Sequence, residues 1–128
     1  MLYSSYLSVP YLLVSNTEAI HRIPLTQITH LSAHNSSTEI RTIDQQRLVS
    51  AKPIHLYENL LVNQGFLRIH QSTLINLYHL RAIIKQEGTS YATLTSGEKL
   101  PIARTQKTKL LHHLKTHSIN HEPYKKTI

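Results

Sequence analysis

The sequence contains no cysteine among its 128 residues. Disulfide bridges, thiolate zinc sites, iron–sulfur clusters and cysteine nucleophiles are therefore excluded. Glycine is also scarce. Gly65, Gly88 and Gly97 lie far apart, so neither a phosphate-binding loop nor a dinucleotide-binding fingerprint can be built from them. These absences remove most thiol-dependent and nucleotide-dependent enzymes.

Long apolar runs are missing as well. Runs such as Tyr11–Val14 span about four residues, whereas a membrane helix needs about 20. No basic residue precedes Arg22, so the N-terminus lacks the charged region of a secretory signal. We therefore expect a cytoplasmic chain without membrane insertion, and the length of 128 residues fits one domain with one core.

Acidic residues are few, with seven Asp and Glu against 14 Lys and Arg, which gives a net charge of +7. This imbalance indicates a polyanionic partner, nucleic acid first and an anionic membrane surface second. Catalysis has little support, because Asp44 is the only aspartate and no Ser-His-Asp set or carboxylate pair is legible. We expect a protein that is not an enzyme and that needs no cofactor.

Short β-type runs fill most of the chain and predict strands separated by polar turns. The expected strands are Tyr11–Val14, Ile20–Ile23, Ile28–Ser32, Glu39–Ile43, Leu48–Val49, Phe66–His70, Thr73–Asn76, Leu80–Lys85, Tyr91–Thr95 and Lys99–Ile102. Strands alternating with helices, as in parallel α/β proteins, are absent. The pattern therefore predicts a mainly β domain.

Two short helices are expected between and after these strands. The first runs from Pro53 to Val62, because proline is well placed in a first helical turn and Gly65 follows the segment. Its Leu56, Leu60 and Leu61 are predicted to share the buried face. The second runs from about Thr105 to His117, with an apolar stripe formed by Leu110, Leu111 and Leu114.

The segment from Gly65 to Leu80, GFLRIHQSTLINLYHL, carries the densest motif. It reads Gly-Phe-x-Arg-x-His-x-Ser, followed by apolar residues and Asn76, and it resembles the signature of the LytTR DNA-binding domain. Leu94–Arg104, LTSGEKLPIAR, resembles the next block of that family, and Ile20–Ser32 resembles an upstream stretch. The resemblance covers about residues 10–115.

The resemblance implies an elongated sandwich of about ten short strands in three small sheets with two short helices. It divides the chain into an N-terminal extension (1–10), a LytTR-like domain (11–117) and a polar C-terminal tail (118–128). Members usually follow a receiver domain. Because 128 residues leave no room for one, we expect a stand-alone version here. They commonly bind direct repeats of double-stranded DNA as two copies, through loops rather than a recognition helix.

Three loops are the DNA-binding candidates that the resemblance implies. In the first, His34–Thr38, the position of Thr38 enters the major groove in the family, Asn35 could read adenine instead, and Ser37 lies between them. In the second, Gln71 has the two-point geometry for adenine and Ser72 would donate to a phosphate. For His70 in that loop, a structural role through a backbone bond is favoured over a DNA contact.

The third loop begins the last helix. Arg104 matches a groove-inserted arginine of the family, and its planar fork suits guanine. Thr105 could cap the helix, and Lys107 and Lys109 would neutralise phosphates. Arg68 could contact a phosphate or form a cross-strand pair. Asn76 is expected to hold backbone rather than DNA.

Other interpretations stay open. A protein-interaction module of the same fold could antagonise another regulator or bind a membrane or regulatory protein partner. An RNA binder would need exposed aromatics for stacking, and the tyrosines are scattered. His113, His117 and His121, spaced every four residues, could bind zinc or nickel on a continuous helix. An exposed polar face is the favoured interpretation, so no metal is expected.

Overall fold

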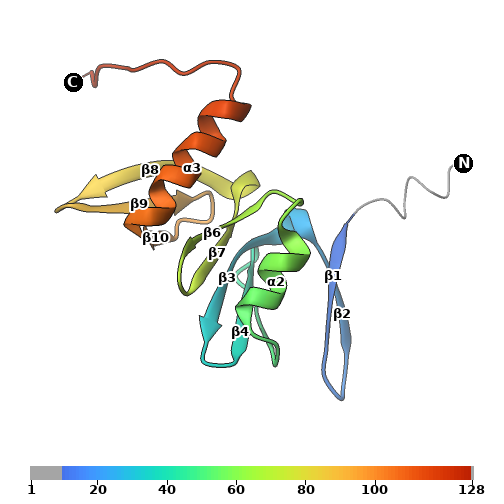
Figure 1. The fold of residues 1–128 in the computed structure, drawn as a ribbon. Helices are drawn as coiled ribbons and strands as arrows, with labels where there is room; N and C mark the ends of the chain where they lie inside the picture. The colour runs from blue at the N-terminus through green and yellow to red at the C-terminus, as the bar shows by residue number, and fades with distance from the viewer. Residues whose placement is uncertain (1–9, 128) are drawn as a thin grey trace, which may run out of the picture.

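The computed structural model describes residues 10–127, which fold into three antiparallel sheets and two α-helices (Figure 1). A hairpin of β1 (Tyr11–Ser15) and β2 (Ile20–Pro24) forms the smallest sheet. The largest has the order β5-β4-β3-β7-β6, made of β3 (Ile28–His34), β4 (Ser37–Thr42), β5 (Arg47–Ser50), β6 (Phe66–His70) and β7 (Thr73–Asn76). The third has the order β10-β9-β8, made of β8 (Leu80–Gln86), β9 (Thr89–Leu94) and β10 (Lys99–Ile102).

The five-stranded sheet separates two apolar cores. Leu31, Ile40 and Leu74 pack in one core against α2 (Ile54–Leu61) and the β1–β2 hairpin. Ile69 and Ile75 pack in the other, against the three-stranded sheet and α3 (Arg104–His117). Successive side chains of a strand point to opposite faces, so neighbouring Leu74 and Ile75 enter different cores. The expected sandwich of ten strands in three sheets is confirmed, although its core is divided.

The buried face of α2 differs from the prediction. Ile54, Tyr57 and Leu61 face the core, whereas Leu60 is 64% exposed and Leu56 is exposed as well. The hydroxyl of Tyr57 meets the buried hydroxyl of Ser50 at 2.6 Å. This contact favours the observed rotation of the helix. A prediction based on leucines alone does not find this rotation, because the buried face also contains the large apolar ring of Tyr57.

Two boundaries matter for the site. The turn between β3 and β4 contains only Asn35 and Ser36, so β4 begins at Ser37 rather than at Glu39. Asn35 has a φ of +57°, a left-handed conformation that asparagine tolerates better than most residues. The last helix begins at Arg104, after Ala103 as N-cap. Thr105 therefore lies inside the first turn and does not cap the helix.

Buried polar side chains join the layers. Asn76 donates from Nδ2 to the carbonyls of Leu25 and Ile28, at 3.0 and 2.9 Å, and its Oδ1 accepts from the amide of Tyr78. Its predicted role as a backbone anchor is confirmed. His79 donates from Nε2 to the carbonyl of Thr26 at 2.6 Å, which ties the three-stranded sheet to the segment before β3.

His30 is buried between the sheets, with Nδ1 3.5 Å from a carboxylate oxygen of Glu98. Burial lowers the pKa of His30 and outweighs the opposing effect of Glu98, so the ring is neutral near pH 7. The Glu98 contact is therefore not a charged ion pair at that pH. In residues 10–127, neither helix has the length and apolar character needed to cross a membrane.

Candidate nucleic-acid interface

Segments from three parts of the chain meet along one edge of the molecule. The amide of Ala33, before the β3–β4 turn, donates to the carbonyl of Ser72 in the β6–β7 turn at 2.8 Å. The amide of Ala103, before α3, donates to the carbonyl of Ile69 at 2.8 Å. The β3–β4 turn, the β6–β7 turn and the start of α3 therefore lie in a row, which descends the left side of Figure 1. We call this the turn row.

Arg68 is a brace for the middle member of the turn row. Its Nε donates to the carbonyl of His70 at 2.9 Å, one terminal nitrogen donates to the carbonyl of Gln71, and the other lies 2.8 Å from a carboxylate oxygen of Glu58. The side chain is only 17% exposed. Of the two roles predicted for Arg68, pairing within the protein is the one that these contacts support, although its partner is on α2 rather than on a neighbouring strand.

His70 also shapes the β6–β7 turn. Its Nδ1 accepts from the amide of Ser72 at 3.1 Å and lies 3.0 Å from the Ser72 hydroxyl. An accepting Nδ1 places the ring proton on Nε2. The bond from the Ser72 amide is the structural role that the sequence favours for His70. The same ring nitrogen also engages the Ser72 hydroxyl, which the resemblance assigns to a phosphate. Gln71 projects from the same turn and is exposed.

Thr38 has a different place from the one expected. Its side chain is fully buried, and Oγ1 donates to the carbonyl of Lys52 at 2.7 Å. The predicted contact between Thr38 and a base is therefore wrong for this conformation, because strand alternation turns the side chain inward. Ser37 is half-buried, and the exposed members of the turn are Asn35 and Ser36. Ser36 lies inside the predicted loop His34–Thr38, but it was not among the predicted contacts because the groove-entering position was assigned to Thr38.

The start of α3 supplies the third member of the turn row. Arg104 and Thr105 are exposed in its first turn, which contains no acidic residue and no side-chain cap. The helix dipole and the uncapped amides of such a terminus favour an anion. Gln106 donates to the carbonyl of Arg68 at 2.9 Å and so fixes this terminus to β6.

A cleft beside Arg104 extends the turn row to the β8–β9 hairpin. It has a volume of about 410 Å³ and is lined by Lys85, Gly88, Thr89, Ser90, Ile102, Arg104 and Lys107. Three cations and two hydroxyl residues thus converge, and none of the described lining residues is a carboxylate. The exposed Lys109 is not among the lining residues. Lys85 was missed because its proximity to Arg104 depends on the packing of α3 against the third sheet.

A buried carboxylate organises the face next to the β3–β4 turn. Glu39 accepts hydrogen bonds from Arg47 and from Nε2 of His34, the latter at 2.9 Å, and Arg41 lies 3.7 Å away. Burial alone would raise the pKa of Glu39, but these cationic and hydrogen-bonding partners hold it below its usual value. Glu39 is therefore ionised near pH 7 and orients His34 at the corner of the turn row.

Comparison with known proteins places the chain in one family. The profile of the LytTr DNA-binding domain matches residues 18–115, which include the whole turn row. The chain belongs to the LytTR family. This LytTR domain superposes on a solved LytTr DNA-binding domain from Bacillus cereus with a TM-score of 0.70, at 20% identity, over 81% of this chain and 95% of that one.

Regulatory proteins of staphylococci are among the relatives of this LytTR domain. It is 31% identical over 93 residues to the sensory transduction protein LytR of Staphylococcus haemolyticus, and 30% identical over 89 residues to the transcriptional regulatory protein LytR of Staphylococcus aureus. These matches cover 72% and 69% of the chain. The chain spans about a third of the length of both relatives, 36% in each case.

The histidine-rich end of the LytTR domain does not assemble the metal site considered from the sequence. His113 and His117 stack with ring centroids 4.3 Å apart, and Nδ1 of His117 donates to the carbonyl of His113. The helix ends at His117, before His121. Within residues 10–127, no group of three or more candidate ligands gathers around one point.

Proposed function

We propose that this LytTR domain is a transcriptional regulator that binds double-stranded DNA sequence-specifically through the turn row. The observation that carries the proposal is the meeting of Asn35, Gln71 and Arg104 on one edge, from segments far apart in the sequence. All three are exposed, and their side chains have the two-point hydrogen-bonding geometry that distinguishes base edges in the major groove.

Phosphate contacts would hold the domain in register. Lys85 and Lys107 lie in the cleft beside Arg104, and the uncapped first turn of α3 offers amides to an anion. Ser36 and Thr105 are exposed hydroxyl residues beside the proposed base contacts. Lys109 makes a weaker, longer-range contribution because it is not in the cleft.

Two copies are expected on one target. The edge of one small domain reaches a short stretch of groove, and a second copy on a repeated site multiplies the specificity. Direct repeats suit this arrangement because each copy would then present the same turn row in the same orientation.

Arg104→Ala tests the proposal. Selection from random DNA would give the target, and fluorescence anisotropy would give its affinity. We expect specific binding to weaken by about 1–3 kcal/mol, with a smaller change on scrambled DNA. Arg81→Ala is the matched control, because Arg81 is exposed on β8 but does not line the cleft. Equal losses in the two variants would remove Arg104 from the interface. Weak, sequence-independent binding by the unaltered protein would instead favour a protein-interaction module.

A further inference from the structure

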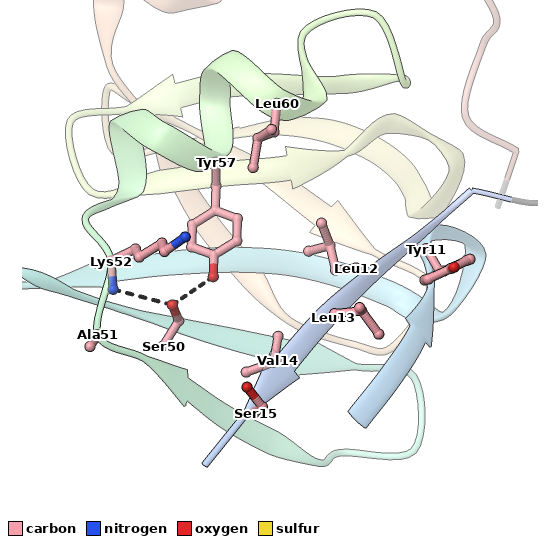
Figure 2. Close-up of a pocket in the computed structure, with 10 residues that line it drawn as sticks. All are labelled: Tyr11, Leu12, Leu13, Val14, Ser15, Ser50, Ala51, Lys52, Tyr57 and Leu60. Carbon is pink, nitrogen blue, oxygen red and sulfur yellow. Dashed lines mark hydrogen bonds between the residues drawn. The ribbon is translucent and has the colours of Figure 1, made fainter. Parts of the chain in front are cut away.

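A second hollow lies outside the turn row, between β1, the end of β5 and α2 (Figure 2). Its volume is about 640 Å³, a size typical of sites for small organic ligands. Leu12, Val14, Tyr57 and Leu60 provide apolar walls. Leu60 is 64% exposed, so the hollow has an apolar rim that residues 10–127 do not cover.

The charge that lines this hollow is positive. Of the described residues that line it, Lys52 is the only charged one and none is a carboxylate. Among residues 10–127, the ion pairs do not include Lys52. Figure 2 shows the Lys52 side chain extending toward the ring of Tyr57. A cation without a counterion beside apolar walls complements a ligand with an apolar body and one anionic group.

Hydrogen bonds join the hollow to Thr38, near the start of β4. The hydroxyl of Ser50 lies 2.6 Å from that of Tyr57 and accepts from the amide of Lys52 at 3.2 Å. The carbonyl of Lys52 then accepts from Oγ1 of Thr38, whose backbone pairs with Ser50 across β4 and β5. Thr38 is two residues after Ser36 in the turn. A ligand that moves Lys52 or Tyr57 therefore acts on the segment that holds the turn.

We propose that this hollow binds a small amphipathic anion, with its apolar body against Leu12, Val14 and Tyr57 and its carboxylate or sulfonate on Lys52, and that the ligand shifts the β3–β4 turn. Binding itself is independent of the proposed function. The effect on DNA affinity rests on it.

The binding test compares two dyes. Anilinonaphthalene sulfonate has the required anionic group, and N-phenyl-1-naphthylamine has the same aromatic body without the charge. We expect Lys52→Met to weaken binding of the sulfonate by about threefold to tenfold and to leave the uncharged dye unaffected. Leu60→Ser should weaken both dyes.

Two controls locate the dye. Lys115→Met removes a cation beside a different apolar surface, formed by Leu111 and Leu114, and should leave the binding of both dyes unchanged. Leu56→Ser changes an exposed leucine of α2 that does not line the hollow. Equal sulfonate binding by the Lys52 variant and the unaltered protein, or equal losses in the Lys52 and Lys115 variants, would overturn the site.

The coupling test uses decanoate. We expect amide chemical shifts of Asn35, Ser36 and Thr38 to move together with those of Ser50 and Lys52 during a titration, and not to move in the Lys52→Met protein. DNA affinity should change at least twofold at saturating decanoate. Shifts confined to the hollow, with unchanged DNA affinity, would refute the coupling. Failure of the ligand-free protein to select any DNA would refute the proposed function, while the dye result would still decide the site.

Discussion

The substitution Arg68→Lys tests whether Arg68 supports the β6–β7 turn as a brace or contacts a phosphate of DNA. In the structure the guanidinium reaches two carbonyls of the β6–β7 turn and the carboxylate of Glu58. Lysine keeps the charge but cannot reproduce a planar fork that reaches three acceptors. If Arg68 is a brace, the substitution should lower the stability of the domain and leave the salt dependence of DNA binding unchanged.

The magnitude follows from the bonds lost. Each hydrogen bond from the charged guanidinium to a turn carbonyl contributes about 1.5–3 kcal/mol, and lysine retains one of the two. The Glu58 bond is discounted because the Glu58 side chain is 40% exposed. We expect the free energy of unfolding to fall by about 2–3 kcal/mol, which for a domain of this size lowers Tm by about 6–15 °C.

Urea denaturation followed by circular dichroism measures the loss, and DNA affinity at several salt concentrations measures the electrostatics. The slope of log K against log salt should be unchanged, because no phosphate contact disappears. Glu58→Gln, which removes one charge and leaves both turn carbonyls bonded, should cost less than half as much. A stable Arg68→Lys protein whose salt slope has changed would refute the brace.

Three further outcomes are expected. Lys85→Ala should lower the salt slope of DNA binding by about 0.9 without changing sequence preference, and an unchanged slope would place Lys85 outside the interface. Asn76→Ala should cost about 2–4 kcal/mol in urea denaturation, because two buried carbonyls and the Tyr78 amide each lose a hydrogen bond, and a loss under 1 kcal/mol would contradict its anchoring role. Stability should fall as the pH drops below about 6.5, because burial lowers the pKa of His30 and the unfolded chain takes up the proton first. His30→Gln should flatten this dependence between pH 7.5 and 5.5, and an unaltered pH profile would show that His30 does not cause it.

Much of the fold follows from local pattern. Short β-type runs predicted β7 with its observed bounds and β3 with an end two residues too early, and Pro53 and Gly65 bracketed α2, because these signals depend on backbone preferences within a few residues. The rotation of α2 did not follow, since the Tyr57–Ser50 contact joins residues on different elements. Counting leucines alone therefore placed Leu60 inside.

The candidate site shows the same division. Arg104 and Gln71 were found from a motif, and both are exposed on the turn row. Thr38 was misplaced because one residue of register turns a strand side chain from solvent to core. Lys85 was not found, because 19 positions separate it from Arg104 and only the packing of α3 brings it into the cleft.

The sequence by itself determined the excess of positive charge, the β-rich class and the motif that identifies the family. These properties reside in composition or in short runs. Tertiary structure alone decided that three turns form one row, that Arg68 and His70 support the row, and that Lys52 faces an apolar hollow linked to Thr38. The physical reason is that such contacts join residues distant in the chain, and their partners are selected by packing and hydrogen bonding rather than by local preference.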